Sequence, residues 1–105
     1  MTMADQLLPD AARCTLPLLY SQEHLGDDAT VFVKFFTPDG SWTWYATEFD
    51  GDDTFFGLVD GHERELGYFS LAELRSARGP LGLSIERDEH FVPKTLAQVR
   101  KGSRS

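Results

Sequence analysis

The sequence lacks most of the motifs that indicate a disulfide framework, a membrane span, a catalytic site or a metal site. It has one cysteine, Cys14, so no disulfide can form within the chain. It has no signal peptide and no apolar run near the roughly 18 residues that a membrane span needs. It also lacks a phosphate-binding glycine-rich loop, a nucleophile elbow and the Cys/His spacing of a zinc site. These absences predict a cytoplasmic protein that holds no cofactor or metal and is not an enzyme.

Positive charge is scarce over most of the chain. All 17 acidic residues but only six of the ten basic residues lie in residues 1–93, so the formal charge of that part is −11. A body this acidic repels nucleic-acid phosphates. We therefore expect no direct binding of nucleic acid by the acidic body and no membrane binding, and we expect a protein partner instead.

What the chain does contain is enough apolar and aromatic material for one folded domain. Hydrophobic residues make up 41% of the 105 residues and aromatic residues 12%, which excludes disorder for the bulk of the chain. We expect a flexible arm over residues 1–15, one globular domain over 16–93 and a basic tail over 94–105. Within that tail, residues 95–100 have the pattern of one or two helical turns.

Residues 30–69 read as four short strands joined by three turns. The first turn, Thr37-Pro38-Asp39-Gly40, has the composition of a three-residue hairpin loop with a bulge. In that register Thr37 lies opposite Ser41, which places Lys34 opposite Trp44. Residues 50–53 and 61–64 form the other two turns, and residues 84–92 are expected to return as an edge strand or an extended segment.

The strands come out apolar on both faces, so each face of the sheet needs a cover. A helix over residues 71–78 supplies one, because Ser70 and Glu73 form a capping box at its start. The other cover must come from the chain termini, a homodimer or a partner. The predicted fold is therefore α+β, a four-stranded antiparallel meander with one short capped helix packed on one face. The residues expected in its core are Val33, Phe35, Tyr45, Phe56, Leu58, Phe69, Leu71 and Leu74.

Two groups of residues suggest a metal site and an acid–base pair, and both also have simpler structural explanations. The acidic turn 50–53, with Asp60 and Glu63 near the opposite end of the next strand, offers oxygen ligands for a divalent metal, but it lacks the spacing of a calcium loop. Asp and Gly also suit turns for geometric reasons. Residues 86–90 could pair a carboxylate with His90 for acid–base work, although a charged edge strand explains the same residues.

The two tryptophans fall on one face of a predicted strand, as in a base-stacking platform. Such platforms lie in cationic grooves, whereas this body is anionic. Core packing of Trp42 and Trp44, with a cation–π contact from Lys34, fits the sequence better.

Several segments together resemble a known family. They are LPLLYSQE, VKFFTPDGSWTWYATEFD and FFGLVDGHERELGYFSLAELRSARGPLGLSIERDEHF, and they cover about residues 16–93. The chain resembles a small bacterial family known as domain of unknown function 2958. The resemblance implies carriage on plasmids, phages and integrating elements, beside antirestriction and other DNA-handling genes. It supplies no catalytic motif.

Charge and resemblance together lead to one functional expectation. The chain is expected to be a non-enzymatic accessory protein of a mobile genetic element, which blocks a cationic nucleic-acid-handling surface of a host defence system of the anti-restriction or anti-CRISPR type. Its partner would be a cationic host nuclease or CRISPR effector. The alternatives are an interaction or ligand-binding module serving plasmid or phage replication or transfer proteins, and a small metal-dependent hydrolase. The expected partner-binding residues are Asp50, Asp52, Asp53, Asp60, Glu63, Trp42 and Trp44.

Overall fold

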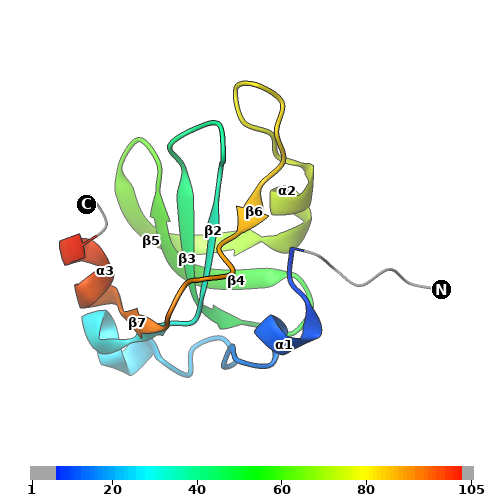
Figure 1. The fold of residues 1–105 in the computed structure, drawn as a ribbon. Coiled ribbons are helices and arrows are strands. Elements are labelled where there is room, and N and C mark those ends of the chain that lie inside the picture. The colour runs from blue at the N-terminus through cyan, green and yellow to red at the C-terminus, as the bar shows by residue number, and fades with distance from the viewer. Residues whose placement is uncertain (1–6, 103–105) are drawn as a thin grey trace.

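A twisted antiparallel sheet forms the centre of the computed structural model, which describes residues 7–102 (Figure 1). The α+β class and the antiparallel sheet predicted from the sequence are confirmed. The elements in chain order are α1 (Asp10–Arg13), η1 (Glu23–Asp28), β1 (Thr30–Val31), β2 (Val33–Phe36), β3 (Thr43–Phe49), β4 (Thr54–Asp60), β5 (Arg64–Ser70), α2 (Leu71–Ser76), β6 (Glu86–Arg87), β7 (Lys94–Thr95) and α3 (Leu96–Gly102).

The main sheet has five strands, where the sequence predicted four. Its order is β5-β4-β3-β2-β6, so the predicted meander is present as β2 to β5 and β6 adds a fifth strand beside β2. The buried side chain of Ile85 anchors the returning chain just before β6. A separate two-stranded sheet pairs β1 with β7.

The register of the first hairpin differs from the prediction by one residue. The Thr37 N–H donates to the Trp42 carbonyl at 3.0 Å, and the Trp42 N–H donates to Thr37 Oγ1 at 3.0 Å. The loop therefore spans residues 38–41 and is longer than predicted. Because side chains alternate between faces, this shift places Trp44 opposite Phe35, and Lys34 opposite Tyr45. The predicted pairing of Lys34 with Trp44 was wrong.

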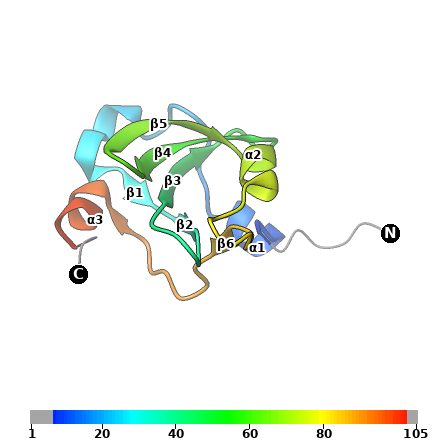
Figure 2. The ribbon, with the colours of Figure 1, turned by 90° about the horizontal axis from the view of Figure 1, so that it is seen from above.

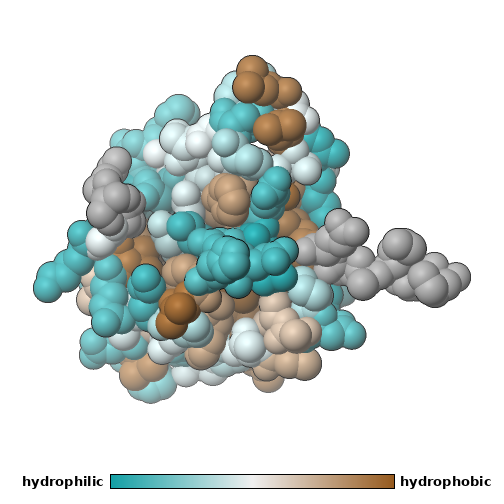
Figure 3. Space-filling model, in the orientation of Figure 1, coloured by the Kyte–Doolittle hydropathy of each residue, from teal (hydrophilic) through white to brown (hydrophobic). Residues whose placement is uncertain are grey.

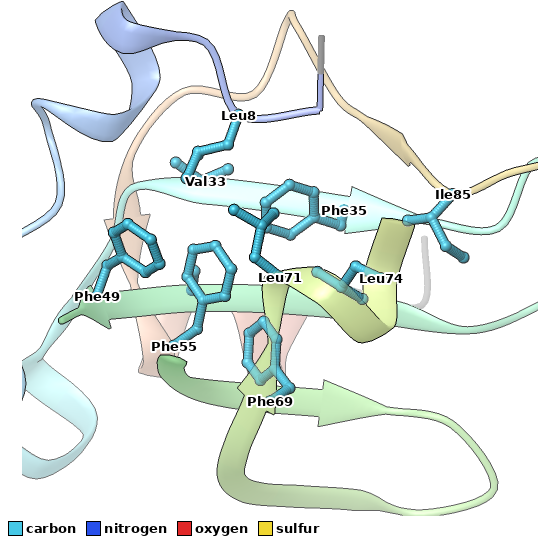
Figure 4. Packing of buried hydrophobic residues seen from close by; sticks show 10 residues of the cluster. Leu8, Val33, Phe35, Phe49, Phe55, Phe69, Leu71, Leu74 and Ile85 are labelled. Atoms are coloured by element: carbon cyan, nitrogen blue, oxygen red, sulfur yellow. The ribbon is translucent and has the colours of Figure 1, made fainter. Parts of the chain in front are cut away.

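The first face of the sheet carries an aromatic core. Phe35 and Phe55 are fully buried and meet edge to face with ring centroids 5.4 Å apart, and Phe55 also stacks on Phe49 and Phe69 (Figure 4). Helix α2 covers this face with Leu71 and Leu74, as predicted. Leu8, from the segment expected to be a flexible arm, is also buried here; residues 1–6 of that arm lie outside the described part of the chain.

Helix α2 begins as predicted and ends early. The Ser70 hydroxyl accepts the Glu73 N–H at 3.2 Å, which is the expected N-cap bond. The helix ends at Ser76, two residues before the predicted end, because Ala77 already has extended backbone angles.

The second face is closed by the carboxyl-terminal segment. Leu96 and Val99 of α3 pack with Val31, Tyr45 and Leu58. Helices α2 and α3 lie on opposite sides of the molecule (Figure 2). Residues 94–102, expected to be a basic tail, thus belong to the fold as β7 and α3.

Every predicted core residue is buried except Phe56, which is half-buried. Among residues 7–102 there is no helix with the length and apolar character needed to span a membrane.

Candidate functional site

Three loops meet at one end of the sheet. They are the β2–β3 loop, the β4–β5 turn and the loop between α2 and β6 (Figure 1). The Asp39 carboxylate joins the first to the third, because its Oδ2 accepts the Leu81 N–H at 2.7 Å and the Leu83 N–H at 3.2 Å. Gly79 packs against the same carboxylate so closely that a side chain there would overlap it.

Trp42 is the most prominent aromatic residue at this end. Its ring centroid lies 6.0 Å from that of Trp44 and 5.5 Å from that of His62. Gly61 passes directly beneath the ring, where a Cβ would overlap it. Trp42 is still 37% exposed, so it is held in place by its neighbours and remains accessible to a partner.

A pocket of about 400 Å³ opens between the tryptophans and the α2–β6 loop. Its walls are mostly apolar, and Arg78 stands at its margin with its guanidinium donating to the Arg75 and Ala77 carbonyls. The lining residues are Thr37, Gly40, Ser41, Trp42, Trp44, Ala77, Arg78, Gly79, Pro80 and Ile85. Exposed Leu81 and Leu83 belong to the loop above it, where Figure 3 shows hydrophobic surface at the top of the molecule.

Part of the predicted partner-binding set lies together at this end. Thr43 pairs with Asp60 and Trp44 with Val59, so the Asp60 side chain lies on the opposite face of the sheet from Trp44, on the side of Tyr45. Asp60 lies 3.4 Å from the Arg64 guanidinium, whereas Glu63 is exposed in the turn. We call the group formed by Trp42, Trp44, His62 and Glu63 the tryptophan surface.

The other part of the set lies at the opposite end of β4. There Asp50 Oδ1 accepts the backbone N–H groups of Asp52, Asp53 and Thr54 at 2.8, 2.8 and 3.1 Å. These bonds, led by the one from Asp52, lower the pKa of Asp50. Asp50 therefore stabilises its own turn, and the structure does not bring residues 50–53 together with the tryptophan surface.

The Asp53 carboxylate likewise forms its hydrogen bonds within the fold. Its carboxylate accepts the Ser70 hydroxyl at 2.6 Å and the Ala72 N–H at 2.8 Å, at the start of α2. The Ser70 bond is the main reason that the pKa of Asp53 is lowered. Within residues 7–102 no group of three or more His, Cys, Asp or Glu side chains is arranged to hold a metal ion.

Among the residues that the structure describes, no carboxylate pairs with the His90 imidazole in the way considered from the sequence. Asp88 Oδ1 accepts the His90 backbone N–H at 2.9 Å, and Asp88 Oδ2 lies 3.7 Å from Lys34 Nζ. Lys34 also lies over the Tyr45 ring at 5.9 Å, so its cation–π partner is Tyr45 and not a tryptophan. Burial is the main reason that the pKa of Tyr45 is raised.

A second exposed aromatic group was not predicted from the sequence. Tyr20, Leu66 and Tyr68 are 60%, 46% and 55% exposed, and we call them the tyrosine surface. A hydrogen bond with the Tyr20 side chain is the main reason that the pKa of Tyr68 is raised. The alternation of Leu66 and Tyr68 around Gly67 was a visible signal, but it only acquires meaning once β5 is known to be an edge strand.

A buried carboxylate fixes the position of Tyr20. Glu48 is 3% exposed, and its two oxygens accept the N–H groups of Tyr20 and Gln22, each at 2.7 Å. The Gln22 side chain in turn donates to the Thr30 and Thr47 carbonyls and accepts the Thr30 N–H. Tyr20 is thereby held at φ 72°, the left-handed conformation that residues other than glycine rarely adopt.

Comparison with known proteins identifies a family without a described activity. Neither the curated proteins nor the solved structures give a match to the chain. A family model described as "Protein of unknown function (DUF2958)" matches residues 7–100, which extends the resemblance seen over 16–93 to both flanking segments. The match covers most of the chain, including α1, the sheet and nearly all of α3. The chain therefore belongs to the DUF2958 family.

Proposed function

We propose that this chain is a non-enzymatic accessory protein of a mobile genetic element that binds a cationic nucleic-acid-handling surface of a host defence enzyme. The enzyme would be of the restriction or CRISPR type. The observation that carries the proposal is that exposed carboxylates of the β4–β5 turn and the start of β5 have no ion-pair partner among the described residues. Glu63 and Glu65 are exposed, and neither forms an ion pair with a basic side chain in the described part of the chain.

Unpaired carboxylates are suited to replace phosphates on a basic surface. They attract Lys and Arg side chains that otherwise bind the nucleic-acid backbone, and they speed association at low salt. In the fold, Glu63 lies in the β4–β5 turn next to His62, which contacts the Trp42 ring. An exposed carboxylate is therefore next in sequence to the histidine that contacts the accessible Trp42 ring.

Trp42 supplies the apolar centre that such an interface needs. Tryptophan is among the residues that contribute most to binding when a rim of polar groups excludes water from it. Trp42 is preorganised by Trp44, His62 and Gly61, so little side-chain entropy is lost on binding. The carboxylates of Asp50 and Asp53 contribute charge at a distance, because their hydrogen bonds are made within the chain.

The sequence suggested that an uncovered second face of the sheet would bind the partner, and the fold does not support that part of the argument. The centre of the second face of the sheet, around Tyr45 and Leu58, does not need a partner, because α3 covers it with Leu96 and Val99. The proposed interface is therefore the tryptophan surface and not an open sheet face.

The experiment is affinity capture from host lysate across a salt titration. The chain, Trp42→Ala and Glu63→Lys are compared with Val92→Ala, a control in which an exposed side chain far along the sequence is shortened. We expect the chain and the control to capture a nuclease or effector with a basic nucleic-acid site, with capture falling steeply as salt rises. Both variants of the tryptophan surface should capture it at least about tenfold less well.

A different outcome would favour the second candidate, a ligand-binding or interaction module for replication or transfer proteins. The 400 Å³ apolar pocket beside Trp44 is the observation that supports it. Capture that is indifferent to salt and recovers only proteins encoded by the same element would contradict our proposal and support the module.

A further inference from the structure

The two edges of the main sheet differ in how they are protected. The β6 edge is only two residues long, and both residues, Glu86 and Arg87, are charged. The β5 edge is seven residues long and contains no proline or lysine. Its pairing with β4 runs without a bulge from Thr54 opposite Ser70 to Asp60 opposite Arg64. Short length, charge and bulges prevent strand-to-strand association, and β5 has only a charged pair at its start.

The tyrosine surface borders this open edge. Leu66 and Tyr68 lie opposite Leu58 and Phe56, so they extend the second face of the sheet to its rim. Phe56 meets Tyr68 edge to face at 5.0 Å, and Tyr20 is held beside Tyr68 by the bonds to Glu48. An accessible backbone edge and accessible aromatic side chains therefore occur at the same place.

We propose that β5 pairs with β5 of a second copy of the chain, antiparallel and about a two-fold axis at Gly67. This is the one symmetric register that pairs all seven residues of each strand. It places Leu66 opposite the partner's Tyr68, so exposed apolar side chains meet on the second face. It also places Glu65 opposite the partner's Phe69, and Arg64 opposite the partner's Ser70, so no like charges face each other.

The geometry at the axis and the net charge give the dimer distinctive properties. Gly67 has open space around the position of a Cβ among the described residues, so no neighbouring side chain packs over the face of the strand at the centre of the pairing. Each copy carries a formal charge of −7, and the two copies repel each other at long range. Salt screens that repulsion, so the dimer should become tighter as salt rises. The proposed binding to a cationic enzyme has the opposite salt dependence, so the two ideas can fail independently.

Sedimentation equilibrium of the purified full chain over a range of concentrations tests the proposal. We expect the mass to rise from 11.8 kDa towards twice that value, with a dissociation constant that falls on adding salt. Leu66→Glu should raise the dissociation constant at least about tenfold, because the symmetric interface contains each contact twice. Leu83→Glu, which changes a leucine of similar exposure (49%) in the α2–β6 loop, should leave it unchanged.

Amide hydrogen exchange separates this dimer from any other. In the proposed dimer, outward-facing β5 amides gain protection as the protein concentration rises, and Leu66→Glu abolishes that gain. A mass of 11.8 kDa at every concentration would overturn the proposal. A dimer that survives Leu66→Glu, or that leaves β5 exchange unchanged, would overturn it equally.

Discussion

Gly57 and Gly67 face each other across β4 and β5, yet only one of the two sites has room for a side chain. A Cβ at Gly57 would overlap the Tyr45 carbonyl oxygen, which is backbone and cannot move aside, whereas a Cβ at Gly67 meets nothing. We expect Gly57→Ala to lower the free energy of unfolding by about 3 kcal/mol. Gly67→Ala should change it by less than about 1 kcal/mol, in the stabilising direction.

Urea denaturation of dilute protein measures both glycine variants. Equal effects of the two substitutions would contradict the close approach of β3 to Gly57.

Asp53 should make the stability of the fold depend on pH. Its pKa is lower in the folded chain than the ordinary value of 3.8, chiefly because Ser70 donates to the ionised carboxylate. Its contribution is therefore complete above the unfolded pKa and is lost as pH falls through the folded pKa. We expect Asp53→Asn to destabilise the protein at pH 7, with the difference from the wild type narrowing below about pH 4.

Asp52 provides the matched control for Asp53, because it lies in the same turn and its side chain is exposed. Asp52→Asn should leave the denaturation midpoint at pH 7 nearly unchanged. A loss as large as that of Asp53→Asn would show that general charge in the turn matters more than the cap on α2.

Helix α3 carries the clearest prediction at the scale of an element. Leu96 and Val99 are 2% and 3% exposed and close the second face of the sheet. We expect Leu96→Ala to lower the free energy of unfolding by about 3 kcal/mol. Lys101→Ala, in the same helix with an exposed side chain, should change it by less than about 0.5 kcal/mol.

Thermal or chemical denaturation of the two variants tests whether residues 94–102 are part of the folded core. If Leu96→Ala is as mild as Lys101→Ala, residues 94–102 behave as the basic tail that composition suggested.

Local signals in the sequence were sufficient for the elements that depend on local chemistry. The turn at 50–53, the turn that begins at Gly61 and the Ser70 cap of α2 follow from residue types at fixed spacings, so β3, β4, β5 and α2 could be predicted, although the second turn is one residue shorter than the predicted 61–64 because Arg64 pairs with Asp60. The β2–β3 register could not, because it depends on the Thr37 side chain, which accepts the Trp42 N–H and lengthens the loop by one residue. The helical turns predicted at residues 95–100 are confirmed as α3, but the packing of α3 against the sheet could not be predicted, because only two buried residues mark its inner face.

The candidate site was predictable in part for the same reason. Trp42, Trp44, Asp60 and Glu63 reach the same end of the sheet because consecutive antiparallel strands bring alternate turns there, but Asp60 lies on the other face from Trp44. Residues 50–53 belong to the intervening turn, and therefore lie one strand length away. The tyrosine surface depends on Glu48, whose bonds to Tyr20 and Gln22 cross more than 25 residues of sequence.

At the scale of the whole molecule, net charge determines how the chain associates with other proteins. Its formal charge of −7 attracts basic partners and repels copies of itself. Trp42 belongs to the β2–β3 loop and not to β5, so we expect a dimer formed through β5 to leave Trp42 accessible on each copy, although Glu65 lies within the proposed dimer.

Competition with DNA tests the central claim most directly. The enzyme captured from the host is purified, and its affinity for a labelled DNA duplex is measured by fluorescence anisotropy at increasing concentrations of the chain, with Glu63→Lys as the weakened variant and Val92→Ala as the control. Because the carboxylates are proposed to occupy the phosphate-binding surface, the apparent dissociation constant for DNA should rise in proportion to the concentration of the chain and of the control, and much less with Glu63→Lys. A ternary complex in which DNA binds with unchanged affinity would contradict the account.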